Sequence, residues 1–252
     1  MRLLALLVAV VVSGCVVQSG GYVGVAPLAP RPSPPVGMVG GGGVQAQVSV
    51  RISFFGVPLD GAQDVVFVLD RSGSMSGVAA GFAGSSVGMS KTGAVLAGLG
   101  AQVANSATGN HLPTKLEAAK AELVRTLRMM PDGTRINVIW FDDDIATLSR
   151  SMLVLQPSSR AAIEQFIAGI KPGGSTAAVP ALELAYAMGA ARVVLLSDGL
   201  ANTGGGGNEL LARARDEMRR GVRFDTVGLG IDQDGALMQS LARESGGVAM
   251  MR

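Results

Sequence analysis

The sequence predicts an α/β fold, in which a doubly wound, mostly parallel sheet is flanked by helices, with an extra N-terminal edge strand. From residue 64 onward, strand-like segments alternate with helical segments of about 10 to 15 residues, the pattern of parallel α/β sheets. Residues 64–70 are apolar on both faces, which is typical of a central strand covered by helices. The length of 252 residues suits one large domain with appendages, or two small domains.

The first half of the folded part contains three elements. Residues 44–54 alternate between apolar and polar side chains, which predicts a half-buried strand at an edge of the sheet. The central strand over 64–70 follows. Residues 114–130 show helical spacing of apolar side chains, and Thr114 with Glu117 gives the pattern of a capping box.

The second half continues the alternation. The expected elements are a strand over 135–141, a helix from about Arg160, a helix over 175–190, a strand over 191–199, a helix over 208–221, a strand over 222–230, a helix over 234–246 and a last strand over 247–251. In the helix over 175–190, Thr176 is the expected N-cap, and Pro180 lies in the first turn, where proline is tolerated.

The N-terminus has the layout of an export signal. Arg2 precedes an apolar run, Leu3 to Val12, that is shorter than the roughly 20 residues of a membrane-spanning helix. The segment "VSGC" resembles the lipobox of bacterial lipoproteins, in which the signal is cut before a cysteine that then carries the lipid. The resemblance implies a signal peptide over 1–14 and a lipid anchor on Cys15; an ordinary cleaved signal with an unmodified cysteine is the alternative.

The lipid would place the protein in the bacterial cell envelope. Val16 stands where an aspartate favours inner-membrane retention in such lipoproteins, so the resemblance favours the outer membrane. Residues 15–43 are rich in proline and then in glycine, which predicts an extended, loosely jointed tether. The folded domain is then expected over 44–252.

Composition excludes several classes of function. The chain has one cysteine and one histidine, His111, so it forms no internal disulfide and no cluster of thiolate and imidazole ligands. A net charge of +2 and 4% aromatic residues give no clustered basic, aromatic surface, so we expect no binding to nucleic acid.

Oxygen-bearing side chains gather where the predicted strands end. Asp70, Ser72 and Ser74 follow the central strand at a spacing of two, which points them to one side. "LLSDG" ends a second strand with Asp198, and "GGST" precedes a helix with Thr176. Ligands of such sheets bind beyond the carboxyl ends of the strands, so these segments form the candidate site.

The three segments "DRSGSM", "GGST" and "LLSDG" resemble, in order, the loops of a von Willebrand factor type A domain, over roughly residues 64–252. The resemblance implies a Rossmann-like fold and a metal-ion-dependent adhesion site. Its serines and threonine bind the cation directly, and its aspartates bind it directly or through water. Carried over to this sequence, the metal ligands are Asp70, Ser72, Ser74, Thr176 and Asp198.

The ligand chemistry agrees with this resemblance. All five candidates offer hard oxygens, which suit a divalent cation, Mg²⁺ foremost, with Mn²⁺ and Ca²⁺ as alternatives. An Asp or Glu carboxylate of a protein partner is expected to complete the coordination. The alternative is a degenerate site that holds no metal, in which Asp70 and Asp198 only cap turns.

A long insertion interrupts the resemblance to the family. Residues 78–113, rich in Gly, Ala and Ser, are inserted beside the candidate site. They either act there, by covering it, shaping a partner's approach or forming a helix around 94–104, or are a tolerated flexible insertion.

Three further features lie near the candidate site. The run Asp142 to Asp144 fits a second cation site or a solvated turn. Trp140 is expected in the core, and Arg71 is expected to point away from the site or to contact an anionic partner.

Three functions remain open from the sequence. The first is a lipid-anchored, non-enzymatic module that binds a protein through its cation. The second is a metal-dependent hydrolase, acting for example on phosphate esters, with Asp142 to Asp144 or Asp198 as the candidate base. The third is a structural envelope protein with a stabilising metal. The missing histidine, lysine or cysteine beside the motifs favours the first.

Overall fold

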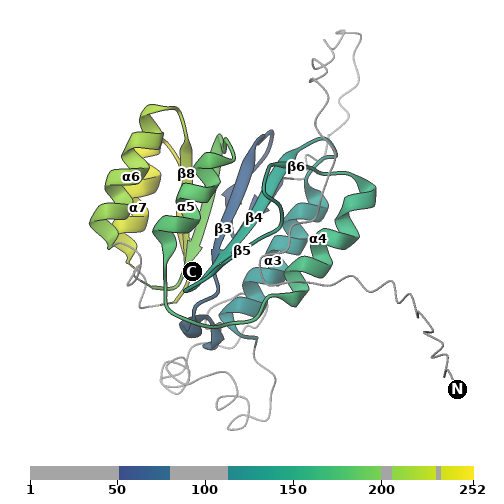
Figure 1. The fold of residues 1–252 in the computed structure, drawn as a ribbon, viewed down its shortest axis with the longest axis horizontal. Coiled ribbons are helices and arrows are strands. Elements are labelled where there is room, and N and C mark those ends of the chain that lie inside the picture. The colour runs from purple at the N-terminus through teal and green to yellow at the C-terminus, as the bar shows by residue number, and fades with distance from the viewer. Residues whose placement is uncertain (1–50, 80–112, 200–205, 231–233) are drawn as a thin grey trace, which may run out of the picture.

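The computed structural model describes residues 51–79, 113–199, 206–230 and 234–252, and Figure 1 shows their fold. The strands of the main sheet are β3 (Val65–Asp70), β4 (Arg135–Phe141), β5 (Ile145–Thr147), β6 (Leu153–Val154), β7 (Arg192–Ser197), β8 (Arg223–Gly228) and β9 (Ala249–Met251). The helices are α3 (Lys115–Met129), α4 (Pro157–Gly169), α5 (Ala178–Ala187), α6 (Gly207–Arg219) and α7 (Gly235–Ser245).

The main sheet is mostly parallel, as predicted. Its strands run in the order β5-β4-β3-β7-β8-β9, and β6 also pairs with β4. β3 is central and pairs in parallel with both β4 and β7, while the short strands β5 and β6 are antiparallel to β4. The carboxyl ends of the five parallel strands (β3, β4, β7, β8 and β9) therefore lie along the same edge of the sheet.

Helices cover both faces, so the doubly wound prediction is confirmed. Alternate side chains of β3 divide between two apolar cores because successive side chains of a strand point to opposite faces. Val65, Phe67 and Leu69 pack in the core beneath α3 and α4, and Val66 and Val68 in the core beneath α5, α6 and α7. Figure 1 shows the two groups of helices on either side of the sheet.

Most predicted elements agree with the structure within a few residues. The capping box of α3 is present, because the Thr114 side chain accepts from the Glu117 amide and the Glu117 side chain accepts from the Thr114 amide. Trp140 is fully buried, as expected. The N-cap prediction for α5 was wrong: Ala177 occupies that position and Thr176 precedes it.

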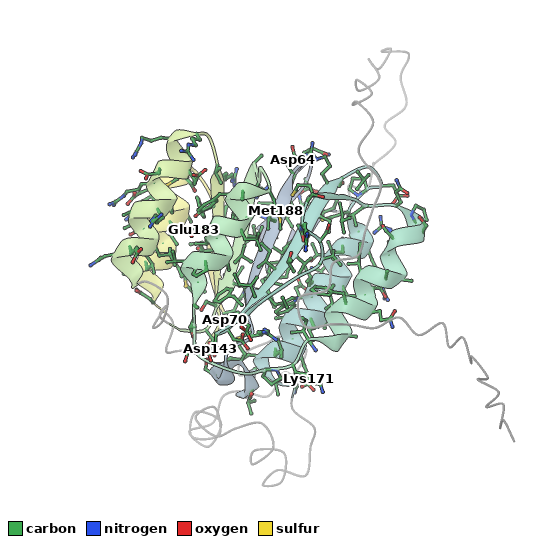
Figure 2. The ribbon with its side chains drawn as sticks, viewed as in Figure 1. Asp64, Asp70, Asp143, Lys171, Glu183 and Met188 are labelled. Atoms are coloured by element: carbon green, nitrogen blue, oxygen red, sulfur yellow. The ribbon has the colours of Figure 1, made fainter. Side chains whose placement is uncertain are left out.

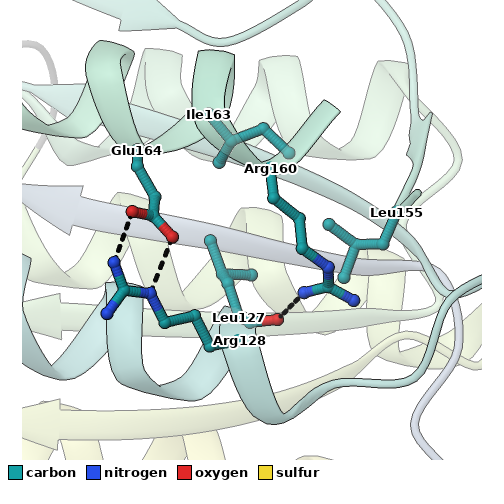
Figure 3. Close-up of a pocket in the computed structure, with 6 residues that line it drawn as sticks. All are labelled: Leu127, Arg128, Leu155, Arg160, Ile163 and Glu164. Carbon is teal, nitrogen blue, oxygen red and sulfur yellow. Dashed lines mark hydrogen bonds and ion pairs between the residues drawn. The ribbon is translucent and has the colours of Figure 1, made fainter. Parts of the chain in front are cut away.

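Helix α4 begins earlier than the expected Arg160, because Pro157 starts it. Proline suits the first position of a helix, where its missing N–H has no intrahelical partner. The Arg160 guanidinium instead caps the end of α3, where it donates to the Met130 carbonyl at 2.9 Å. Arg128 of α3 pairs with Glu164 of α4 beside it, and the cavity between the two helices has a volume of only about 10 Å³ (Figure 3).

The N-terminal strand differs from its prediction. Only Ser53–Phe54 (β1) is a strand among the described residues of 44–54, and it pairs with Val57–Pro58 (β2) in a separate two-stranded sheet. The chain reverses because Phe55 and Gly56 both have positive φ, at 49° and 90°, as a type I′ hairpin turn requires. The hairpin contacts α3 through β1 and β8 through β2, and its strands are not hydrogen-bonded into the main sheet.

Several predictions fall outside the described residues. Residues 1–50, which include Cys15, the expected signal and the expected tether, are among them, and so are 80–112 of the insertion. The ends of the insertion are described: the Ala79 amide donates to the Pro113 carbonyl at 3.0 Å. The two described ends of the insertion therefore lie side by side. No helix among the described segments is long and apolar enough to cross a bilayer.

Gly247, between α7 and β9, is a position where we expect a substitution to lower the stability of the domain. A Cβ on Gly247 would lie 1.7 Å from the Phe224 carbonyl oxygen, so Gly247→Ala forces strands β8 and β9 apart. We expect the variant to lose about 1–3 kcal/mol of unfolding free energy, the usual cost of overpacking, measured by urea denaturation. Gly235→Ala is the matched control, because its Cβ meets nothing within 4 Å. Equal urea midpoints for the two variants would contradict this packing.

Candidate functional site

The candidate residues meet at the edge of the sheet where the parallel strands end. Asp70 ends β3, Asp142 follows β4 and Asp198 follows β7. Because β3 lies between β4 and β7, the loops after these strands are neighbours. Figure 2 shows Asp70 and Asp143 at this edge, and Asp64, which precedes β3, at the opposite one.

The first loop is tightly folded around Asp70. One carboxylate oxygen of Asp70 accepts the Ser72 amide at 2.7 Å, an Asx turn that brings the chain back toward the strand end. The short 3₁₀ helix η1 (Gly73–Ser76) follows, anchored by the fully buried Met75 side chain. Asp70 is itself fully buried, whereas Ser74 is exposed. The loop thus leads from a buried carboxylate to a hydroxyl at the surface.

Hydrogen bonds link the first loop to Asp198. The Ser72 and Ser74 hydroxyl oxygens lie 3.0 Å apart, and the Ser74 hydroxyl donates to Asp198 at 2.7 Å. Ser74 and Asp198 are 124 positions apart in the sequence. The prediction that these segments converge is therefore correct for Asp70, Ser72, Ser74 and Asp198.

The loop that carries Thr176 is attached to the first loop through its backbone. The Gly73 amide donates to the Gly174 carbonyl at 3.1 Å, and the Gly173 amide donates to the Arg71 carbonyl at 2.9 Å. Thr176 is buried, with an exposed fraction of 5% for the whole residue. The structure thus brings the segment that carries Thr176 against the first loop.

The Asp142 to Asp144 loop supports Thr176 from both sides. The Asp143 carboxylate accepts the Ser175 amide at 3.0 Å, and the Asp142 carbonyl accepts the Ala177 amide at 3.1 Å. A Cβ on Gly174 would lie 2.6 Å from the Asp143 carboxylate, so this close approach needs glycine. The loop after β4 therefore positions the loop that carries Thr176.

Neither sequence interpretation of the three aspartates fully describes this loop. Asp142 is buried and forms an ion pair with Arg71 at 2.8 Å, while Asp143 and Asp144 are exposed. The same ion pair shows that Arg71 contacts the loop after β4, which the sequence did not predict. Within the described parts of the chain, no three Asp, Glu, His or Cys side chains gather as metal ligands, so a second cation site at Asp142 to Asp144 has no support.

Two further side chains contact the candidate site. The Ser197 hydroxyl, at the end of β7, donates to the second carboxylate oxygen of Asp70 at 2.6 Å. The Lys115 ammonium, at the start of α3, donates to Asp198 at 2.7 Å. Sequence reasoning missed both. A signal existed for Lys115, because a cation at the first position of a helix opposes the helix dipole and calls for another reason to be there.

The two aspartates have different electrostatic environments. Burial raises the pKa of Asp70 above its ordinary value, against the lowering effect of the hydrogen bonds from Ser197 and Ser72. The charge of Asp198 raises the Asp70 pKa further. Asp198, whose side chain is fully buried, has the Lys115 ammonium as its counter-charge. Asp70 thus carries a desolvated carboxylate that added positive charge nearby would stabilise.

The donor set fits a hard divalent cation. Asp70, Ser72, Ser74 and Asp198 offer carboxylate and hydroxyl oxygens in one hydrogen-bonded cluster, and Mg²⁺ and Ca²⁺ prefer oxygen ligands. With two aspartates in the cluster, hydroxyls must supply a large share of the ligands. The exposed position of Ser74 leaves one side of the cluster open to solvent.

A sequence-family comparison decides the classification. The model of the von Willebrand factor type A domain matches residues 102–251, more than half of the 252 residues. The chain belongs to the von Willebrand factor type A family. Domains of this family typically act as adhesion or binding modules. The match begins after Asp70, Ser72 and Ser74, so their place in this von Willebrand factor A domain rests on the structure, in which β3 lies between β4 and β7.

Solved structures agree with the fold. A von Willebrand factor type A protein from Catenulispora acidiphila superposes with a TM-score of 0.54 at 17% identity, over 75% of this chain and 38% of that one. The PilB minor pilin from Streptococcus sanguinis gives 0.50 at 15% identity, over 75% and 56%. The chain therefore spans well under two thirds of these proteins.

A third structure contains a metal. Proximal thread matrix protein 1 from the mussel byssus, with zinc in its metal-ion-dependent adhesion site, gives a TM-score of 0.47 at 18% identity, over 74% of this chain and 40% of that one. A likeness at this level says nothing of what the present chain binds. No curated protein matches the chain.

The hydrogen bond from the Ser175 amide to Asp143 is expected to slow hydrogen exchange at that amide. Asp143→Ala removes the acceptor of the Ser175 amide, so we expect that amide to exchange its hydrogen about tenfold faster, measured by NMR. Asp144→Ala is the matched control. Asp144 is exposed, and the Ser175 amide donates to Asp143 and not to Asp144. Unchanged Ser175 exchange in the Asp143 variant would show that the loop holds itself in place.

Proposed function

We propose that this von Willebrand factor A domain is a non-enzymatic binding module that holds a divalent cation and grips an acidic group of a protein partner through it. The observation that carries the proposal is the convergence of Asp70, Ser72, Ser74 and Asp198 in one hydrogen-bonded cluster. Thr176 is the fifth proposed ligand, on a loop that is hydrogen-bonded to the first one.

The proposed roles follow from the contacts. The hydroxyls of Ser72, Ser74 and Thr176 are the proposed direct ligands, and Asp70 and Asp198 are proposed to bind the cation directly or through water. In the metal-free protein these two aspartates accept hydrogen bonds from the Ser72 amide and the Ser74 hydroxyl. Mg²⁺ is the proposed cation, with Mn²⁺ and Ca²⁺ as alternatives, because every donor is a hard oxygen. A bound cation would supply a coordination position that a partner carboxylate could fill, and the exposed Ser74 leaves one side of the cluster accessible to such a partner.

The contacts argue against the hydrolase hypothesis, which needs a general base beside the cation. Asp142 pairs with Arg71, Asp143 accepts the Ser175 amide, and Asp198 pairs with Lys115. These three carboxylates are already engaged in holding the loops, and the fourth candidate base, Asp144, is exposed to solvent. Turnover of a generic phosphate ester that depends on added Mg²⁺ would reverse this conclusion.

Titration calorimetry with Mn²⁺ on metal-free protein tests the cation site. We expect binding of one ion, and at least tenfold weaker binding by Asp70→Ala, because the variant loses a charge and the Asx turn. Ser76→Ala is the control, since it alters a hydroxyl of the same 3₁₀ turn outside the proposed ligand set. Equal heats from the wild-type and Asp70→Ala proteins would remove the basis of the proposal.

The wild-type and Asp70→Ala proteins also test whether a protein partner binds through the cation. Capture from envelope extract should require the cation, so EDTA and Asp70→Ala should each abolish the captured band. If chelation lowers the melting temperature and leaves capture unchanged, the cation only stabilises the fold, and the structural-protein hypothesis replaces this one.

We also propose that the domain is exported and anchored by a lipid on Cys15 in the bacterial envelope, in the outer membrane in preference to the inner one. The supporting features are the apolar run, the "VSGC" segment and Val16. Cys15→Ser should abolish labelling of the protein by a fatty-acid analogue. Ser19→Ala, in the proposed tether, should leave the labelling unchanged. Labelling that survives Cys15→Ser would contradict the anchor.

A further inference from the structure

Lys115 places a fixed positive charge inside the proposed cation site. Its ammonium donates to Asp198 at 2.7 Å, and the other oxygen of the same carboxylate accepts the Ser74 hydroxyl at 2.7 Å. The Lys115 side chain is 12% exposed and that of Asp198 is fully buried. Water therefore screens this ion pair poorly.

The Lys115 side chain passes close to two glycines. A Cβ on Gly230, after β8, would lie 3.1 Å from the Lys115 ammonium, and one on Gly77 would lie 3.8 Å from the Lys115 Cε. Gly230 has a positive φ of 84°, which favours glycine there in any case. The Lys115 backbone is fixed too, since its amide donates to the Gly77 carbonyl at 2.9 Å. Backbone and side chain thus hold the ammonium against Asp198.

This charge opposes a divalent cation bound to the same cluster. Asp70 and Asp198 together neutralise one divalent ion, but Lys115 already compensates Asp198. A like charge close to a site disfavours a second one, more strongly where water is excluded. Without the ammonium, Asp198 is left as a buried charge with no ionic partner among the described residues of the metal-free protein, which destabilises that state.

We propose that Lys115 is an internal counter-cation that stabilises the metal-free site and weakens its affinity for divalent ions. The inference rests on the proposed function, because it concerns the same cation site. Lys115 is a positioning and tuning residue in this account and is not itself a ligand.

Mn²⁺ titration of metal-free protein, with thermal melting beside it, tests this role. Lys115→Met keeps the aliphatic stem and removes the charge, so we expect the dissociation constant for Mn²⁺ to fall about tenfold. The metal-free variant should melt at a lower temperature than the wild type, and Mn²⁺ should raise its melting temperature by more. Lys115→Arg, which keeps the charge, should bind Mn²⁺ as weakly as the wild type.

Arg219→Met is the control for net charge, because Arg219 lies at the exposed end of α6, away from the site. It should leave both readouts unchanged. Equal dissociation constants for the wild type and Lys115→Met would overturn the inference and leave the cation site standing. Absence of binding by both proteins would overturn both proposals, whereas binding by Lys115→Met alone would support the role of Lys115 and overturn the proposed function of the wild type.

Discussion

The site depends on one constraint, the parallel pairing of β3 with β4 on one side and β7 on the other. Parallel neighbours end at the same edge, so three loops distant in sequence must meet there. The hydrogen bond from Ser74 to Asp198 joins the loops after β3 and β7 directly. The ion pair of Arg71 with Asp142 joins the loops after β3 and β4 in the same way.

The buried polar groups of this edge form one connected system. Asp70 binds Ser72 and Ser197, Asp198 binds Ser74 and Lys115, and the loop after β4 holds the residues on either side of Thr176. Buried polar groups need partners, and here several of the partners come from distant segments of the chain. The loops therefore hold one another in place before any ligand arrives, and this preorganisation is what a binding site requires.

The sequence was sufficient to predict the class of fold and the convergence of the candidate residues. Both depend on strong local signals: apolar strands, a capping box, and oxygen-bearing residues at strand ends. β5 and β6 were missed because strands of three and two residues have no detectable period. The N-terminal hairpin was missed because its reversal depends on the positive φ of Phe55, which is rare for a bulky residue.

The roles of individual charges were harder to predict, for a physical reason. Asp142 looked like a solvent-facing or metal-binding aspartate because its partner, Arg71, lies 71 positions away. A lysine at the first position of a helix hinted at some further contact, but only the structure shows that its partner is Asp198, 83 positions away. Which carboxylates are left for a ligand depends on such long-range pairs, and no local pattern encodes them.

Crystallography with Mn²⁺ tests the central claim most directly. Crystals of the protein grown with MnCl₂ should show an anomalous difference peak bounded by the hydroxyls of Ser72, Ser74 and Thr176, at metal–oxygen distances of about 2.0–2.3 Å. A peak elsewhere, or ordered loops with no peak at this position, would contradict the claim that these loops form a cation site.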